Sequence, residues 1–220
     1  MTAIRTVIFD LDGTLLDSLD DLTDSVNYAL SENGFSPLPR VEVQALLGNG
    51  VKALIRGALP GNAGDTDFEK VYQTFHSYYL EHCMDKTRPY EGILPMLADL
   101  RERGYRLAIV SNKLDEMVQR LYGRFFSSYV DLAIGEGPGV RRKPCPDGVS
   151  LAAQRLGTPL SAAVYVGDSE VDLATAKNAR VACLSVLWGF RTREFLVEAG
   201  AVHLVDEPAH LPAEVLGLYV

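Results

Sequence analysis

Residues 6–14 read TVIFDLDGT, and this stretch decides the fold. Its first four residues, Thr6–Phe9, are apolar or β-branched, which is typical of a strand buried on both faces of a parallel sheet. Asp10 and Asp12 follow at once, and Gly13 lets the backbone turn sharply. A buried strand that runs into two acids predicts an open α/β sheet with its ligand site at the carboxyl ends of the strands.

Short apolar runs of the same kind recur along the chain, and helical patterns separate them. Their ranges are Thr6–Phe9, Leu107–Val110, Val130–Ile134, Ala163–Val166 and Val181–Val186, with a weaker candidate at His203–Val205. Gly104 and Gly157 stand where two of the intervening helices are expected to end. This βαβ alternation predicts a doubly wound α/β fold built on a parallel sheet.

The stretch between the first two strands breaks the alternation, because it reads as helix throughout. We therefore expect residues 17–88 to form an inserted all-helical cap, and residues 1–16 and 89–220 to form the catalytic core. Ser18 and Asp21 predict a capping box at the start of the first inserted helix. Because the insertion leaves from the carboxyl end of the first strand, we expect it to cover the ligand site as a lid.

Composition narrows the classes of partner. The formal net charge of −8 disfavours broad binding to nucleic acid or to anionic membranes. The longest apolar run, Val181–Phe190, is shorter than the ~20 residues that span a bilayer, and no long apolar segment precedes the first strand. Cys83, Cys145 and Cys183 lie far apart without metal-type spacing, so we expect reduced thiols in a cytoplasmic protein. The sequence indicates no protein partner.

The pair Asp10 and Asp12 has several readings. Side chains alternate along a strand, so we expect both carboxylates on one side, where either a cation lies between them or one pKa rises. A solvated turn would explain the pair taken alone. An EF-hand requires glycine where Leu15 stands, and the GxxxxGK[ST] of a P-loop ATPase is missing from the sequence. The spacing of Gly135–Gly139 is GxGxG, which makes a dinucleotide site a weak reading.

The ends of the other strands favour a catalytic site. The second strand ends at Ser111 and Asn112, and the fourth ends at Asp168, with Asp172 one helical turn further on. Lys143 precedes the helix that leads to the fourth strand. A carboxylate can accept a phosphoryl group, Mg²⁺ prefers carboxylate oxygens, and a lysine and a hydroxyl can stabilise the phosphate charge. This set of residues predicts phosphoryl transfer.

Four motifs in this order resemble the haloacid dehalogenase (HAD) superfamily. They are DxDGT at Asp10–Thr14, a hydrophobic strand followed by Ser111-Asn112, Lys143-Pro144, and GDSxxD at Gly167–Asp172. The resemblance implies a Rossmann-like core with strand order 5-4-1-2-3. It also implies a Mg²⁺-dependent phosphoric monoester hydrolase that works through an aspartyl-phosphate on a small phosphorylated metabolite.

The resemblance assigns a role to each motif residue. Asp10 would be the nucleophile, and Asp12 would be the general acid and then the general base. Thr14 would orient the nucleophile. The phosphate group would be bound by Ser111, Asn112 and Lys143.

The metal site follows from the same resemblance. Mg²⁺ would be held by the side chains of Asp10 and Asp168 and by the backbone carbonyl of Asp12, while Asp172 would support a metal-bound water. Dehalogenases of this superfamily lack an acid two residues after the nucleophile. Asp12 therefore favours phosphate chemistry over carbon–halogen cleavage.

Other features of the sequence, less specific than the four motifs, resemble those of phosphoglycolate phosphatases, which act on 2-phosphoglycolate. They are Asp17-Ser18, the loop Gly48-Asn49-Gly50, Trp188–Arg191 and the helical insertion itself. Gly48, Asn49, Gly50 and Lys52 are our candidates for reading the substrate, although an ordinary turn with a solvated lysine fits this loop equally well. Arg56, like Lys52, could meet a substrate carboxylate, and Arg191 and Arg193 could border the cleft, but we favour reading all three arginines as surface charges. We interpret the four histidines as structural or exposed.

Three alternatives stay open at this point. The substrate could be another sugar or nucleotide phosphate. The aspartyl-phosphate could pass to a sugar, which would make the protein a mutase. The chain could also be a binding protein that keeps the fold without catalysis, although the intact motif residues disfavour this reading.

Overall fold

The computed structural model describes residues 3–218. The chain splits into two compact units: one contains the residues up to Leu16 together with those from Pro89 onward, and the other is Asp17–Arg88. Two short strands, β2 (Leu16–Asp17) and β3 (Arg88–Pro89), pair where the chain passes from one unit to the other and back.

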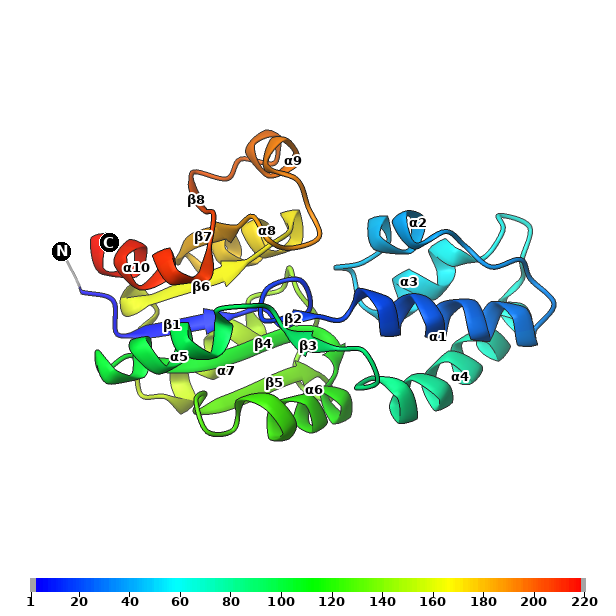
Figure 1. Cartoon of the computed structure of the whole chain (residues 1–220), viewed down its shortest axis with the longest axis horizontal. Helices are drawn as coiled ribbons and strands as arrows, with labels where there is room; N and C mark the ends of the chain where they lie inside the picture. Colours follow the sequence, from blue (N-terminus) through cyan, green and yellow to red (C-terminus); the bar gives the residue numbers. More distant parts are fainter. Residues whose placement is uncertain (1–2, 219–220) are drawn as a thin grey trace. The chain divides into compact units, whose positions relative to one another are not determined.

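A six-stranded sheet organises the first unit. Its strands are β1 (Thr6–Phe9), β4 (Arg106–Leu114), β5 (Leu132–Glu136), β6 (Ala163–Gly167), β7 (Ala182–Val186) and β8 (His203–Val205). All pair in parallel, in the order β5-β4-β1-β6-β7-β8 (Figure 1). When the five main strands are numbered along the chain and read from the β7 edge, the order is 5-4-1-2-3, as expected. The sixth strand, β8, lies at the edge beside β7 and confirms the weaker strand candidate at His203–Val205.

The central strands are buried because helices cover both faces of the sheet. Thr6–Phe9 is fully buried, and β6 is buried along its whole length. Helices α7 and α8 pack on each other and on strands β4–β7, and α5 and α10 pack together across the sheet from them (Figure 1). The bounds of the helical segments in this unit are α5 Ile93–Glu102, α6 Asp115–Leu121, η1 Tyr122–Phe126, α7 Asp147–Arg155, η2 Leu160–Ala162, α8 Glu170–Ala179, α9 Arg193–Glu198, η3 Pro208–His210 and α10 Leu211–Gly217.

The register of the sheet brings the predicted motifs to one edge. Phe9, the last residue of β1, lies beside Ile109 of β4 and Val166 of β6. The segments that follow these three positions carry Asp10, Ser111 and Asp168. Because parallel strands end at a common edge, polar residues that are far apart in sequence meet there.

The second unit is helical, with helices α1 (Leu19–Glu32), α2 (Arg40–Ala45), α3 (Val51–Ala58) and α4 (Asp65–His82). Helix α1 packs on α2 and α4. The predicted capping box is wrong, because the Ser18 side chain makes no capping hydrogen bond. The Asp21 carboxylate instead accepts hydrogen bonds from the backbone amides of Lys86 and Thr87 and from the Thr87 hydroxyl. Asp21 thus ties the first helix of this unit to its last residues.

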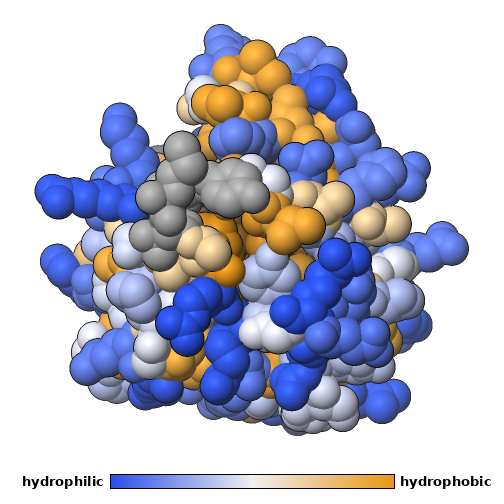
Figure 2. All heavy atoms as spheres, turned by 90° about the vertical axis from the view of Figure 1, so that its left-hand side faces the viewer, coloured by the Kyte–Doolittle hydropathy of each residue, from blue (hydrophilic) through white to orange (hydrophobic). Residues whose placement is uncertain are grey.

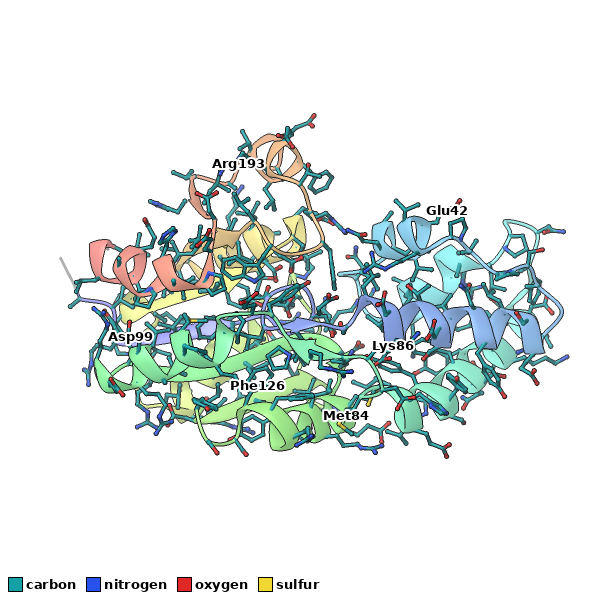
Figure 3. The ribbon with its side chains drawn as sticks, viewed as in Figure 1. Glu42, Met84, Lys86, Asp99, Phe126 and Arg193 are labelled. Carbon is teal, nitrogen blue, oxygen red and sulfur yellow. The ribbon has the colours of Figure 1, made fainter. Side chains whose placement is uncertain are left out.

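The surface carries most of the charged side chains. Asp99, Lys86 and Arg193 extend outward, whereas Phe126 is fully buried (Figure 3). One face of the molecule is mainly hydrophilic, with hydrophobic side chains gathered at its upper end, where α9 lies (Figure 2). Phe195 and Val197 of α9 are exposed. Within residues 3–218, no helix is long and apolar enough to cross a membrane.

Candidate active site

The segment after β1 forms a tight turn that places Asp10 inside the protein. Gly13 takes a left-handed φ of 81°, its amide donates to the carbonyl of Leu16, and the Leu15 amide donates to the carbonyl of Leu11. Asp10 is 7% exposed, and its Oδ1 accepts the Leu11 amide at 2.7 Å. The sequence therefore supplies a nearly buried carboxylate at the end of the central strand.

Three acids meet at this edge of the sheet. Asp10, Asp168 and Asp172 each offer a carboxylate oxygen, and these oxygens lie within 4.8 Å of one another. Glycines make room for them, because a Cβ on Gly13 or Gly189 would collide with Asp168, and one on Gly167 would collide with Asp172. The close approach of the backbone to these carboxylates is the physical reason for glycine at those positions.

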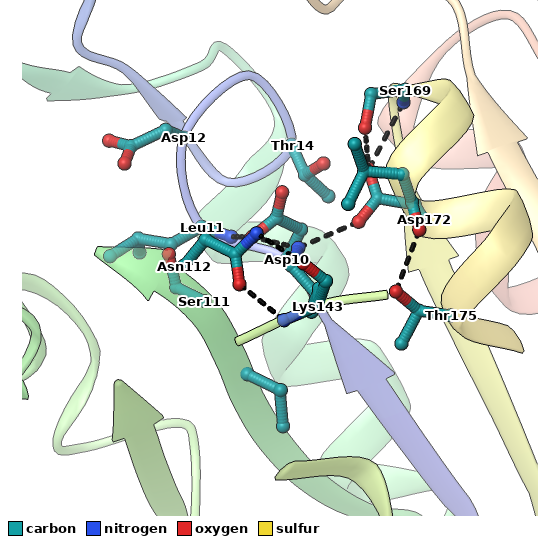
Figure 4. A network of polar contacts seen from close by, with 12 residues as sticks. Asp10, Leu11, Asp12, Thr14, Ser111, Asn112, Lys143, Ser169, Asp172 and Thr175 are labelled. Atoms are coloured by element: carbon teal, nitrogen blue, oxygen red, sulfur yellow. Dashed lines mark hydrogen bonds and ion pairs between the residues drawn. The ribbon is translucent and has the colours of Figure 1, made fainter. Parts of the chain in front are cut away.

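Lys143 is the cation of this cluster. Its Nζ lies 2.8 Å from Oδ1 of Asp10 and 2.7 Å from Oδ1 of Asp172 (Figure 4). The same Nζ contacts the Tyr165 hydroxyl at 3.0 Å. The Asn112 side chain holds the backbone of Lys143, accepting from its amide and donating to its carbonyl. Asn112 therefore braces the lysine segment in this structure, whereas we expected it to bind phosphate.

Burial shifts the pKa values of the cluster. Burial raises the pKa of Asp10 to about 8; Lys143 opposes the rise, and Asp172 and Asp168 add to it. Burial also raises the pKa of Asp168 to about 7, with a further rise from Asp172. Burial alone would lower the pKa of Lys143, but Asp10 and Asp172 outweigh it and raise that pKa well above its usual value. One ammonium among three buried carboxylates leaves the cluster short of positive charge.

The Asp12 side chain points away from Asp10 (Figure 4). Its carboxylate pairs with Nζ of Lys113, at 3.0 Å and 3.1 Å to its two oxygens. The expected repulsion between Asp10 and Asp12 is therefore not what shifts the pKa of Asp10, because the turn after β1 ends the alternation of a regular strand. Ser111 is buried, and its Oγ accepts the Lys113 amide at 3.2 Å, which leaves the hydroxyl proton free to reach another acceptor.

Thr14 lies in the cluster but contacts a different acid from the one expected. Its hydroxyl donates to Oδ1 of Asp168 at 3.1 Å, so it orients Asp168 and not Asp10. Asp172 caps α8, because its Oδ2 accepts from the amides of Asp168 and Ser169 and from the Ser169 hydroxyl.

Sequence reasoning missed Tyr165, and it named Trp188–Arg191 only as a point of resemblance and not as part of the site. Tyr165 faces Lys143 from β6, and the segment after β7 reaches the site through the Phe190 amide, which donates to Asp168 at 2.8 Å, and through Trp188, which donates to the carbonyl of Thr14 at 2.9 Å. Trp188 and Phe190 stand just after a predicted strand, which was the available signal. The reading of Arg191 as a surface charge is wrong, because its side chain is 10% exposed and pairs with Glu170.

The predicted substrate-reading loop lies in the helical unit. Gly48 and Gly50 have φ of 110° and 80°, and Gly50 stands directly before α3. Lys52 is exposed, with its Nζ 6.0 Å from the centre of the Tyr72 ring. Arg56 pairs with Asp65, in agreement with its reading as a surface charge.

The donor set of the acid cluster fits Mg²⁺. Asp10, Asp168 and Asp172 supply only oxygen donors, which this ion prefers, and they are the residues between 3 and 218 whose geometry could hold a metal. Lys143 alone does not neutralise these three carboxylates, so a divalent cation would improve the charge balance of the cluster. When bound there, Mg²⁺ would neutralise charge on a phosphate group.

Known proteins resemble the whole chain. A sequence model of the haloacid dehalogenase-like hydrolases matches residues 7–186. The chain is 34% identical to a phosphoglycolate phosphatase of Aquifex aeolicus over 85% of its length and 86% of that protein, and 27% identical to an N-acetylmuramic acid 6-phosphate phosphatase of Pseudomonas aeruginosa over 97% and 90%.

Solved structures agree with this likeness. A candidate phosphoglycolate phosphatase from Lactobacillus delbrueckii subsp. bulgaricus superposes with a TM-score of 0.94 at 36% identity, covering 99% of this chain and 100% of that one. The matched family model spans every motif residue from Asp10 to Asp172. The chain belongs to the haloacid dehalogenase-like hydrolase family.

Proposed function

We propose that this phosphoric monoester hydrolase cleaves 2-phosphoglycolate, depends on Mg²⁺, and works through an aspartyl-phosphate on Asp10. The observation that carries the proposal is the buried Asp10 carboxylate, paired with Lys143 at 2.8 Å beside Asp168 and Asp172. A buried carboxylate next to one ammonium and a candidate metal site is suited to attack phosphorus and to bear the charge of a bound phosphate.

In the first step, a carboxylate oxygen of Asp10 forms a bond to phosphorus, and the bond from phosphorus to the ester oxygen breaks. For this step Asp12 has to carry a proton, which requires its ion pair with Lys113 to open. Asp12 then gives its proton to the departing oxygen, which leaves as an alcohol. Lys143 and the Ser111 hydroxyl donate hydrogen bonds to the phosphate oxygens. Lys143 also offsets the charge of the nucleophile, which it already contacts.

In the second step, water attacks the phosphorus of the aspartyl-phosphate. Asp12 takes a proton from that water, and the bond from Asp10 to phosphorus breaks, which releases inorganic phosphate and restores both acids. Asp10, Asp168 and Asp172 would hold or support Mg²⁺, with Thr14 and the Phe190 amide keeping Asp168 in place.

The substrate is the finer part of the proposal. Its support is the name of the Aquifex relative and the resemblance of the loop Gly48-Asn49-Gly50 to phosphoglycolate phosphatases. Lys52, which is exposed, is our candidate to meet the substrate carboxylate, and the unit Asp17–Arg88 is our candidate lid. The Pseudomonas relative, named for a sugar phosphate, makes other phosphate esters the main alternative.

We place the enzyme in the cytoplasm as part of the same proposal. Cys83, Cys145 and Cys183 are free thiols, as is usual for proteins of reducing compartments.

A panel of phosphate esters tests the proposal. Phosphate release would be measured from 2-phosphoglycolate, N-acetylmuramic acid 6-phosphate, sugar phosphates and nucleotides, with and without Mg²⁺. A strong, Mg²⁺-dependent preference for 2-phosphoglycolate is expected. Preference for another ester would reject the substrate but keep the phosphatase, whereas sugar-phosphate isomerisation without phosphate release would identify a mutase.

A further inference from the structure

The segment after β7, residues 187–191, is fixed at both of its ends, and we call it the strap. At its start, the Leu187 amide donates to the carbonyl of Val205 at 3.0 Å, which continues the pairing of β7 with β8. At its end, the Arg191 guanidinium pairs with Glu170, the first residue of α8, at 3.1 Å. Because both ends are anchored, the middle of the strap has little freedom to move away from the acid cluster.

The Trp188 side chain of the strap reaches the turn that carries Asp10. Its indole N–H donates to the Thr14 carbonyl at 2.9 Å, and Thr14 is fully buried. The hydroxyl of the same Thr14 donates to Oδ1 of Asp168 at 3.1 Å. A carbonyl in this buried turn is closed off from water, so the indole supplies a hydrogen bond that solvent cannot. Trp188 is therefore joined through Thr14 to an acid of the cluster.

The backbone of the strap contacts Asp168 directly. A Cβ on Gly189 would lie 2.3 Å from Cβ of Asp168 and 2.4 Å from the carbonyl oxygen of Gly13, so only glycine fits there. The next amide, that of Phe190, donates to Oδ2 of Asp168 at 2.8 Å. The strap thus contacts both the turn after β1 and the acid that follows β6, and it links the two segments that supply the cluster.

The acids of the cluster carry more negative charge than Lys143 can balance. The carboxylate oxygens of Asp10, Asp168 and Asp172 lie within 4.8 Å of one another, and Lys143 supplies one positive charge. Like charges at this spacing favour separation of the turn that carries Asp10 from Asp168. Contacts that oppose this separation keep the oxygens close enough together to share a metal ion before the ion arrives.

We propose that Trp188 is a positioning residue of the Mg²⁺ site, whose indole N–H holds the turn after β1 against Asp168 and so keeps Asp10 close to it. This inference rests on the proposed function, because it concerns the same Mg²⁺ site. Trp188 acts through the backbone of Thr14, and its indole contacts neither the ion nor the phosphate group. Loss of the indole N–H should therefore weaken Mg²⁺ binding and leave the chemistry at saturating Mg²⁺ largely intact.

Calorimetric titration with Mg²⁺ alone tests the proposal without substrate. Trp188→Phe keeps an aromatic ring and removes the N–H, so the Kd for Mg²⁺ should rise by about tenfold, the smaller end of what is typical when a group that orients a metal ligand is lost. In kinetic assays with 2-phosphoglycolate, excess Mg²⁺ should restore most of the wild-type kcat. Benzothienylalanine, introduced at position 188 by nonsense suppression, replaces only the indole N–H by sulfur. It should give the same rise in Kd, and it replaces Trp188→Phe if that variant fails to fold.

Tyr122→Phe is the matched control. The Tyr122 hydroxyl donates to the carbonyl of Val130 at 3.0 Å, so this substitution also removes an aromatic donor from a backbone carbonyl. Val130 precedes β5, at the amino ends of the parallel strands and thus at the opposite edge of the sheet from the acids. Thermal unfolding with a chelator should show a lower Tm in both variants, whereas the Kd for Mg²⁺ should rise only in Trp188→Phe.

The contrary results are distinguishable from one another. An unchanged Kd for Mg²⁺ in the folded Trp188 variant, or an equal rise in Tyr122→Phe, would overturn the role of Trp188 while leaving the phosphatase in place. A loss of kcat that excess Mg²⁺ does not restore would also overturn it, because the indole would then act on the chemistry and not on metal binding. Wild-type protein that binds no Mg²⁺ and releases phosphate without it would overturn the Mg²⁺ dependence of the proposed function, and the role of Trp188 with it.

Discussion

The ammonium of Lys143 lies 2.8 Å from Oδ1 of Asp10, and both side chains are nearly closed off from solvent, at 3% and 11% exposure. Lys143 also contacts Asp172 at 2.7 Å, so a single cation is shared by two buried acids, with Asp168 close by. Such a cluster is stable only when its charges are balanced. The balance between the Lys143 ammonium and these carboxylates should therefore affect metal binding, the pH dependence of stability, and catalysis.

Metal binding should depend on Asp168. Asp168→Asn removes one carboxylate charge while keeping the side-chain shape, so the Mg²⁺ concentration for half-maximal activity should rise by at least about tenfold. Titration of activity against Mg²⁺ measures this, and isothermal calorimetry measures Mg²⁺ binding directly. Asp206→Asn, at an exposed acid paired with Arg193, is the control and should leave both unchanged. An unaltered Mg²⁺ dependence in Asp168→Asn would remove Asp168 from the metal site.

Stability of the metal-free protein should fall as pH rises. Burial raises the pKa of Asp10 to about 8 and that of Asp168 to about 7, from ordinary values of 3.8. Between about pH 4 and pH 8 the folded protein therefore binds more protons than the unfolded chain, and stability that is present at low pH is lost through this window.

Mg²⁺ should reverse this loss, because it competes with protons for the same carboxylates. The rise in Tm on adding Mg²⁺ should thus be larger at pH 8 than at pH 5.5. Thermal unfolding at both pH values, with Mg²⁺ and with a chelator, measures the effect. An equal rise in Tm at the two pH values would contradict a metal site built on these acids.

The sequence pattern S-x-x-D occurs at two helix starts, and it forms a capping box at only one of them. At Ser169 and Asp172 both capping contacts are present. At Ser18 they are missing, because Asp21 is taken by Lys86 and Thr87. Local pattern predicted the strands, helices and motif positions well, since these depend on neighbouring residues. It could not predict contacts between segments that are distant in the chain.

The same limit applies within the candidate site. The strand ends predicted Asp10, Ser111 and Asp168 as neighbours, because a parallel sheet gathers its carboxyl ends. Lys143 was added to this group from its place before the helix that leads to the fourth strand. Lys113 was missed because a strand bulge, which no short motif announces, decides where its side chain points.

Asp21 should contribute strongly to the stability of the helical unit. It is 3% exposed and accepts three hydrogen-bond donors, so Asp21→Asn, which replaces one acceptor oxygen by a donor, should cost about 2–3 kcal/mol of unfolding free energy. Urea unfolding measures the cost. Asp24→Asn lies on the same helix and loses an exposed ion pair with Lys86, so it should change stability little. Equal losses of unfolding free energy in the two variants would mean that the hydrogen bonds of Asp21 to Lys86 and Thr87 do not stabilise the helical unit.

The Tyr165 hydroxyl should matter for both stability and catalysis. It donates to the carbonyl of Val110 at 3.1 Å and contacts Lys143, and it is fully buried. Tyr165→Phe removes one buried hydrogen-bond partner from the Val110 carbonyl and one from Lys143, which should cost about 1–3 kcal/mol of unfolding free energy and lower kcat. Urea unfolding and steady-state kinetics measure the two effects. Tyr28→Phe, at an exposed tyrosine, is the control, and a Tyr165→Phe variant with wild-type stability and kcat would be evidence against this role.

Asp10 should carry the phosphoryl group during turnover, and acid quenching should trap that aspartyl-phosphate. Wild-type protein and Asp10→Asn would be mixed with 2-phosphoglycolate and Mg²⁺, quenched in acid within milliseconds, and digested for peptide mass spectrometry. We expect one phosphoryl group on the wild-type peptide that contains Asp10, none on the Asp10→Asn peptide, and a loss of turnover in that variant of at least about a thousandfold. A phosphoryl group on another residue, or near wild-type turnover by Asp10→Asn, would contradict this expectation.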